Sequence, residues 1–337
     1  MHLIIQIPCY NEEKTLPDVL AGIPAEILGV GSIETLVIDD GSTDNTTAIA
    51  RRLGVDHIVK HPYRRGLATA FQTGLDACLR LGADVIVNTD GDNQYPQADI
   101  PRLIGPILDG EADIVVGDRQ TRRVVHFSLW KRVLQQGGSW IVRLASGTEV
   151  PDATSGFRAF SREAALRLTV LTRYTYTLET IIQAGKKGLV ITSVPIEVNA
   201  PRRESRLIKS NWDYVKQSAA TILRLYAFYE PLKTFSWVSL PFFLIGGYYI
   251  GRFVYFFLTG QSARGSHIQS VVIASTLMIL GFLIFMLGVI GDLIATNRLI
   301  LEETLYRTKR MEIEHHPKRS ATEEPSFEER AASFEFK

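Results

Sequence analysis

Two carboxylates separated by one glycine follow an apolar run in the first third of the chain. Asp90 and Asp92 come shortly after residues 85–87, and Gln94 stands two positions beyond the second carboxylate. Carboxylate and amide oxygens suit a hard divalent cation, and Mg²⁺ or Mn²⁺ is usually held by one or two carboxylates together with substrate phosphates. We therefore expect Asp92 and Gln94 to be metal ligands at a site where the oxygens of a diphosphate complete the coordination.

A turn or a helix cap is the simpler explanation of the same residues, because Asp, Gly and Asn are ordinary turn formers. A calcium-binding loop is excluded, since its sixth position would be Tyr95 instead of glycine and its twelfth Pro101 instead of glutamate. The D-x-D pattern alone is a weak signal. The prediction of a metal site therefore depends on the elements that surround it.

Two more polar stretches also follow directly after apolar runs: residues 8–13 (PCYNEE) and 39–44 (DDGSTD). The second begins with Asp39 and Asp40. Capping of the following helix needs only one short polar side chain, so it explains only part of this motif. The additional carboxylate can accept a hydrogen bond from a base imide or a ribose hydroxyl, which predicts a nucleoside site.

Short β-branched runs alternate with helical stretches along the first 120 residues. Strands are expected at 2–8, 34–40, 56–60, 84–90 and 112–119, with helices that begin near residues 15, 44, 66 and 97. This alternation predicts an α/β fold with a mostly parallel sheet and helices on both faces. Ligands of such sheets bind beyond the carboxyl ends of the strands, so the three polar stretches should converge there.

Composition and charge exclude several classes of protein. The chain has 37 Lys and Arg against 36 Asp and Glu, a net charge of +1, which gives no indication of a nucleic-acid partner. Its two cysteines, Cys9 and Cys78, are too few for a disulfide framework and form no zinc motif. The sequence begins with the strand-like MHLIIQIP, so no cleaved signal peptide is expected.

Two nearly continuous apolar stretches, 235–258 and 271–291, are long enough to cross a bilayer. A buried helical hairpin in a soluble protein is the alternative. Arg252, the one basic residue inside the first stretch, lies close enough to its end to reach the interface. Basic residues flank the pair, with Arg224 and Lys233 before it and Arg298, Arg307, Lys309 and Arg310 after it. The short connection TGQSARGSHIQ between the stretches has a single Arg, and this asymmetry predicts that both flanks are cytoplasmic. The expected location is the plasma (inner) membrane.

The motifs IPCYNEE, VIDDGSTDNT, RRGLATAFQTG, NTDGDNQYP, VVGDR and DATSGFRAF occur in an order and at distances that resemble one family. This is glycosyltransferase family 2 with the GT-A fold, and within it the polyprenyl-phosphate glycosyltransferases related to dolichol-phosphate mannose synthase. The resemblance covers residues 3 to about 230. It implies a nucleotide-diphosphate-sugar donor, linked to UDP or GDP, a polyprenyl phosphate acceptor, a Mg²⁺ or Mn²⁺ cofactor and a homo-oligomer.

The resemblance also assigns residues. The nucleotide-sugar site would comprise Pro8, Tyr10, Glu12, Ile38, Asp39, Asp40, Asp90, Gly91, Asp92 and Arg119. Asp90, Asp92, Arg119 and Asp152 would be the catalytic residues, the last of them the weakest assignment. Asp152 and Arg158 could orient the acceptor or could simply pair with each other. The chain departs from the family pattern at its glycine-rich loop, which is here Arg65-Gly66-Leu67-Ala68, and in the segment PRRESRLIK.

A lipid phosphate must be held between the bilayer and the sugar carbon, which requires basic residues. The candidates are Arg122, Arg123, Lys131 and Arg132 in one cluster and Arg202, Arg203, Ser205, Arg206 and Lys209 in another. A solvated basic face is the alternative for each of them. The expected organisation is a cytosolic GT-A domain at 1–210, an amphipathic interfacial helix at 211–233, a transmembrane hairpin at 234–297 and a cytosolic tail at 298–337, disordered from about 315.

The predicted function is the inverting, metal-dependent transfer of a hexose to a dolichyl or undecaprenyl phosphate. A polymerising synthase is excluded, because it needs a QxxRW segment and more spans than the two in this sequence. Two alternatives stay open: a membrane-anchored nucleotide-sugar scaffold without turnover, and a transferase that uses another lipid acceptor. The amphipathic stretch before the spans could likewise pack on the globular domain instead of lying on the membrane.

Overall fold

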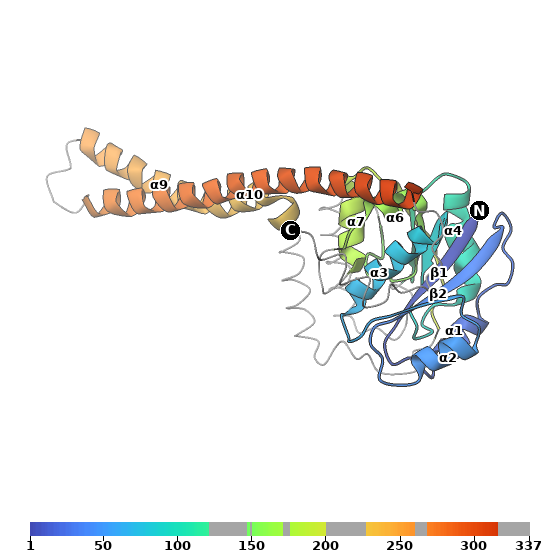
Figure 1. Cartoon of the computed structure of the whole chain (residues 1–337). Coiled ribbons are helices and arrows are strands. Elements are labelled where there is room, and N and C mark those ends of the chain that lie inside the picture. The colour runs from blue at the N-terminus through green and yellow to red at the C-terminus, as the bar shows by residue number, and fades with distance from the viewer. Residues whose placement is uncertain (121–146, 149, 171–175, 200–226, 260–267, 316–337) are drawn as a thin grey trace, which may run out of the picture. The chain divides into compact units, whose positions relative to one another are not determined.

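A computed structural model describes residues 1–120, 147–148, 150–170, 176–199, 227–259 and 268–315 (Figure 1). The chain divides into two compact units. We refer to Met1–Tyr214 with Thr304–Lys337 as the catalytic unit and to Val215–Glu303 as the membrane unit. Each is described by itself below.

A seven-stranded sheet forms the centre of the catalytic unit, with strand order β3-β2-β1-β4-β6-β5-β7. The strands are β1 (His2–Cys9), β2 (Ser32–Asp39), β3 (His57–Lys60), β4 (Val85–Asn88), β5 (Ile114–Asp118), β6 (Arg158–Ser161) and β7 (Ile191–Pro195). Only β6 runs antiparallel to its neighbours β4 and β5. The predicted mostly parallel sheet is confirmed, and because β2, β1 and β4 are adjacent and parallel, their three polar ends converge as expected.

Four helices follow the strands where the sequence predicts them: α1 (Leu16–Ala21), α2 (Thr46–Arg52), α3 (Leu67–Arg80) and α4 (Ile100–Leu108), the last after a 3₁₀ turn η1 (Gln97–Asp99). Helices α6 (Arg162–Arg167) and α7 (Tyr176–Lys186) were not predicted. The last two residues of the predicted strand 84–90, Thr89 and Asp90, lie beyond the end of β4 at Asn88.

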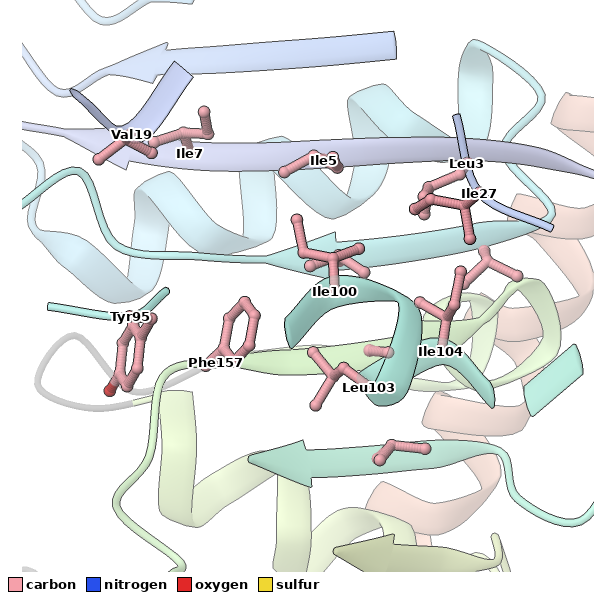
Figure 2. Packing of buried hydrophobic residues seen from close by; sticks show 14 of the residues in the cluster. Leu3, Ile5, Ile7, Val19, Ile27, Tyr95, Ile100, Leu103, Ile104 and Phe157 are labelled. Atoms are coloured by element: carbon pink, nitrogen blue, oxygen red, sulfur yellow. The ribbon is translucent and has the colours of Figure 1, made fainter. Parts of the chain in front are cut away.

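Helices cover both faces of β1, which is why its residues from Leu3 onward are all buried. On one face, Leu3, Ile5 and Ile7 pack in the same cluster as Ile100 and Leu103 of α4 (Figure 2). On the other face, Gln6 meets α3 so closely that a Cβ on Gly74 would lie 2.3 Å from its Oε1 atom. The buried residues of α4 stand at i, i+3, i+4 and i+7, the spacing of one helix face.

The membrane unit contains α9 (Pro231–Leu258) and most of α10 (Ile268–His315). Both helices are long and apolar enough to cross a membrane, and the predicted spans lie inside them. Most side chains of their apolar windows are exposed, which argues against the hairpin of a soluble core. Small residues let the helices approach: a Cβ on Gly281 would lie 3.1 Å from Phe242 Cβ, and one on Gly288 would lie 2.8 Å from Phe235 Cβ.

The sequence-based boundaries after the globular domain differ in detail from the structure. Helix α10 continues to His315, so residues 298–315 of the expected tail are helical. From Thr304 onward α10 belongs to the catalytic unit, where Lys309 Nζ lies 2.9 Å from Asp76 Oδ1 and Tyr306 donates to Glu163 at 2.9 Å. Residues 211–226 and 316–337 lie outside the described part of the chain.

Candidate active site

The loop that follows β4, residues 90–95, is here called the DGD loop. Its backbone turns back on itself at Asn93, whose φ of 59° lies in the left-handed region that asparagine tolerates. Asp92 Oδ1 accepts the N–H of Gln94 at 3.1 Å, an Asx-type turn. At the end of the loop, Gln97 Nε2 donates to Thr89 Oγ1 and to the carbonyl of Tyr95, both at 2.9 Å. These bonds fix where Asp90 and Asp92 point.

Asp90 lies against Gly156, the residue that precedes Phe157. A Cβ on Gly156 would lie 2.9 Å from Asp90 Oδ2 and 2.9 Å from Tyr176 Oη, so only glycine leaves room for the carboxylate. Gly156 is itself held by its N–H, which donates to Tyr95 Oη at 3.0 Å, and by its carbonyl, which accepts from Asn88 Nδ2 at 2.8 Å. Burial and the neighbouring charge of Asp92 raise the pKa of Asp90 to about 7, although Arg119 opposes the shift.

The two carboxylates fit a divalent cation that retains other ligands. A positive charge beside Asp90 would oppose the rise in its pKa that burial and Asp92 cause. Among the described residues, no group of three or more His, Cys, Asp or Glu side chains could hold an ion unaided. This donor set suits Mg²⁺ or Mn²⁺ completed by water and diphosphate oxygens, and the assignment of Asp92 and Gln94 as its ligands stays a prediction.

A second charged pair stands beside this loop. Arg119 Nε and Nη2 donate to the two carboxylate oxygens of Asp152 at 2.7 and 2.9 Å, and Nη2 also donates to Thr154 Oγ1 at 2.7 Å. Burial would raise the pKa of Asp152, but the bonds from Arg119 outweigh it and hold this pKa below its usual value. Asp152 therefore pairs with Arg119, and its suggested pairing with Arg158 is wrong.

Arg158 is fully buried and clamps the chain that carries Asp152 and Gly156. Its guanidinium donates to the carbonyls of Ser155, Ala153 and Thr177 at 2.8 Å and to Thr180 Oγ1 at 2.7 Å. Burial lowers its pKa to about 10. The sequence signal for this role is an arginine inside the otherwise apolar run Phe157–Phe160, and the roles expected from the sequence, acceptor orientation or a pair with Asp152, differ from it.

The Asp39–Asp40 pair at the end of β2 holds backbone in place. Asp40 Oδ1 lies 2.8 Å from His61 Nδ1 and accepts the N–H of Arg65 at 2.8 Å, while Oδ2 accepts the N–H of Gly66 at 2.8 Å. Gly41, with a φ of 72°, lets this loop pack closely, because a Cβ there would lie 2.5 Å from the carbonyl carbon of Tyr63. Asp40 is buried, so its bonds define the shape of the loop 61–66.

That loop places the guanidinium of Arg64 over the ring of Tyr10, 4.3 Å from its centroid. Tyr10 follows β1, and the buried Pro8, Ile38 and Glu12 lie at the same edge of the sheet. A Cβ on Gly91 would lie 2.8 Å from Cys9 Sγ and 3.3 Å from Glu12 Cγ, which brings the end of β1 against the DGD loop. The predicted nucleotide-sugar residues therefore gather at the carboxyl ends of β1, β2, β4 and β5.

Asp39 and Asp44 make local bonds in the same motif. Asp39 Oδ1 accepts the N–H of Ser42 at 2.8 Å, and its other oxygen accepts from Thr47 Oγ1. Asp44 Oδ1 accepts the N–H of Thr46, the first residue of α2, at 3.0 Å, although the N-cap residue itself is Asn45.

The predicted acceptor residues lie outside the described part of the chain. They are Arg122, Arg123, Lys131, Arg132, Arg202, Arg203, Ser205, Arg206 and Lys209. Tyr95, Asn88 and Gly156 are site residues to which the sequence assigned no role, and the clamping role of Arg158 was not predicted either. All four lie in the motifs NTDGDNQYP and DATSGFRAF, but their roles depend on contacts across the sheet.

Known proteins resemble this chain over the catalytic unit. Residues 4–169 match the family described as Glycosyl transferase family 2. The UDP-N-acetylglucosamine–dolichyl-phosphate N-acetylglucosaminyltransferase of Methanococcus voltae is 34% identical over 57% of this chain and 83% of its own. The dolichyl-phosphate hexose transferase of Haloferax volcanii is 32% identical over 61% of this chain and 86% of its own.

Solved structures of glycosyltransferases also match this chain. Glucosyl-3-phosphoglycerate synthase of Mycobacterium tuberculosis, in complex with Mn²⁺, UDP-glucose and phosphoglyceric acid, is 26% identical with a TM-score of 0.54. The match covers 67% of this chain and 80% of that one. Together with the sheet order and the strand-end motifs, these matches identify the family: the chain belongs to glycosyltransferase family 2 and is a glycosyltransferase with the GT-A fold.

Proposed function

We propose that this protein transfers a hexose, with inversion, from a nucleotide-diphosphate sugar to a polyprenyl phosphate at the cytosolic face of a membrane. The observation that carries the proposal is the DGD loop beside Arg119, in a chain that also has two helices able to cross a membrane. The relatives from Methanococcus voltae and Haloferax volcanii, whose names specify dolichyl phosphate, support the lipid acceptor.

Breaking the bond between the sugar carbon and phosphate leaves a nucleoside diphosphate with added negative charge. A Mg²⁺ or Mn²⁺ ion held by Asp92 and Gln94 would supply neutralising charge to that leaving group. Arg119 adds a positive charge from the chain itself, and Asp152 holds its guanidinium in a fixed orientation through two hydrogen bonds. Asp152 is therefore assigned a positioning role, because its oxygens are already bonded to Arg119 and Thr154.

The acceptor needs no strong base. A phosphate monoester has a second pKa near 6, so a polyprenyl phosphate already presents charged oxygens at neutral pH. Attack from the side opposite the leaving diphosphate would give a β-linked product from an α-linked donor. The basic residues Arg203 and Arg206 are the proposed contacts of this phosphate, in keeping with the resemblance.

The test is direct synthesis. The purified chain, reconstituted with undecaprenyl or dolichyl phosphate and Mn²⁺, would be supplied in turn with radiolabelled UDP-glucose, UDP-N-acetylglucosamine and GDP-mannose. We expect one of these to yield a glycolipid of a single sugar, and the chelator EDTA to prevent its formation. Donor binding without product would instead indicate a scaffold, and a polymer would indicate a synthase of another kind.

The acceptor contacts can be tested separately. Arg203→Gln and Arg206→Gln should each weaken the dependence on polyprenyl phosphate roughly ten- to a hundredfold, the equivalent of a lost charge-assisted hydrogen bond. Nucleotide-sugar affinity, measured by calorimetry, should barely change. If donor affinity falls while the acceptor dependence stays the same, these arginines belong to the diphosphate site and Arg122 and Lys131 become the better candidates.

The proposed topology has a simple test as well. A reporter fused after Lys337 should be cytoplasmic, and one inserted near Ser262 should be external. Both reporters on one side would mean that the second apolar stretch does not span the membrane.

A further inference from the structure

The four residues that follow β7, 196–199, run from β5 to the DGD loop. The N–H of Ile196 donates to the carbonyl of Asp118 at 2.9 Å, and that of Glu197 donates to Asp99 Oδ2 at 3.2 Å. Asn199 ends this segment with two bonds to the DGD loop. Its N–H donates to the carbonyl of Gln94 at 3.0 Å, and its Nδ2 donates to the carbonyl of Asn93 at 3.0 Å.

These two bonds determine which way the peptide groups of the loop face. The N–H of Gln94 points to Asp92 Oδ1, while the carbonyls of Asn93 and Gln94 point to Asn199. Asn93 has a left-handed φ of 59°, a conformation that costs free energy and persists only where neighbouring contacts maintain it. Asn199 supplies such contacts from outside the loop.

We propose that Asn199 is a positioning residue for the metal ligands of this enzyme. It holds the Asn93 and Gln94 carbonyls outward, so that the side chains of Asp92 and Gln94 are presented to the cation and the diphosphate. This inference rests on the proposed metal-dependent function. It assigns Asn199 no contact with the substrate.

Two substitutions separate this role from a simple electrostatic one. Asn199→Ala removes the Nδ2 donor and leaves the backbone bond. Asn199→Asp keeps the shape of the side chain but sets a carboxylate against the Asn93 carbonyl oxygen, while adding negative charge near the proposed cation. A positioning residue predicts that both variants weaken metal binding, whereas a general electrostatic effect predicts that the aspartate strengthens it.

The measurement is calorimetric binding of UDP and of GDP to the full chain, each with and without Mn²⁺, and it needs no acceptor. Whichever nucleotide binds the parent protein then serves as the probe. In Asn199→Ala the gain in affinity that Mn²⁺ gives should fall roughly three- to tenfold, the size of one hydrogen bond. Asn199→Asp should lose at least as much. Binding without Mn²⁺ and the melting temperature should stay at the parent values.

Glu197→Ala is the matched control. Glu197 is exposed, lies in the same segment and uses its backbone N–H for the bond to Asp99, so this variant should bind like the parent. The proposal is overturned if Asn199→Asp strengthens Mn²⁺-dependent binding, if Asn199→Ala matches the parent, or if it weakens binding equally with and without Mn²⁺. A parent protein whose nucleotide binding ignores Mn²⁺ would instead refute the proposed metal-dependent function, and this inference with it.

Discussion

Two aspartates stand at the end of β2 and two follow β4, with only β1 between these strands in the sheet, yet the surroundings of the two pairs differ. Asp40 is bonded to three groups of the loop 61–66. Asp92 accepts one N–H from its own loop, and Asp90 lies in a setting that raises its pKa to about 7. Asp40 therefore holds a loop in place, whereas an added positive charge beside Asp90 would stabilise its ionised form.

The largest expected effect comes from Asp92→Asn. Loss of a charged ligand to the proposed cation should reduce transfer on the order of a thousandfold, because metal stabilisation of a leaving group amounts to several kcal/mol. The melting temperature should not fall, since Asp92 makes a single local bond. Initial rates and thermal melts of the purified variant check both statements. A variant that keeps most of its Mn²⁺-dependent turnover would contradict the assignment.

Gly156→Ala should cause the second-largest loss of transfer rate, because the added Cβ would displace the Asp90 carboxylate or Tyr176. A shift of about 1 Å in a reacting group can cost roughly a hundredfold in rate. Gly105→Ala is the matched control: a Cβ at this position in α4 meets no atom within 4 Å, so the rate should be unchanged. Equal rates for Gly156→Ala and the control would show that Asp90 has more room than the structure indicates.

Asp40→Asn, in contrast to the two preceding variants, should lower stability more than it lowers the rate of transfer. The amide places a donor where a carboxylate oxygen now accepts backbone N–H groups, which should cost about 1–3 kcal/mol of unfolding free energy. Chemical denaturation of the parent and the variant measures this loss. If Asp40→Asn leaves stability unchanged and acts only on nucleotide affinity, the distinction between the two pairs is wrong.

Asp152 combines the two cases. It lies in the candidate site, yet its carboxylate oxygens accept hydrogen bonds from several groups, as those of Asp40 do. Its folded-state pKa lies below its unfolded value. The ionised group therefore contributes stability that is fully present above the unfolded pKa of about 3.9 and is lost as the pH falls through the folded pKa. The melting temperature of the parent should decline in this acid range more steeply than that of Asp152→Asn. Parallel declines would mean that Arg119 does not stabilise this carboxylate.

The smallest effect is expected at the tip of the loop that Asp40 holds. Arg64→Gln removes the guanidinium stacked on Tyr10, an interaction of about 0.5–1 kcal/mol at an exposed site. Nucleotide affinity should change by no more than about fivefold. Arg65→Gln removes the same charge one residue later, where the bonds to Asp40 and Thr69 use backbone groups, and should have less effect. Equal losses would indicate a general charge effect.

Much of this molecule could be predicted from local sequence. The strands β1, β2 and β4 and the helix α4 have strong periodic patterns, and parallel strands bring their carboxyl ends together whatever lies between them. The bonds from Arg65 and Gly66 to Asp40 could not be predicted, because they depend on how a distant loop folds back. The position of β6 could not be predicted either. This strand lies antiparallel beside β4, so its beginning, with Arg158 and the nearby Gly156, lies at the site.

The Arg119–Asp152 pair also bears on how the chain between its two members is closed. The N–H of Gly117 donates to the carbonyl of Phe157 at 2.9 Å, so the chain on either side of residues 120–151 is joined at its base. Doubling the length of a loop that is closed in this way costs only about 0.6 kcal/mol. The two closures, Gly117 with Phe157 and Arg119 with Asp152, therefore hold this edge of the sheet together independently of the length of chain between them.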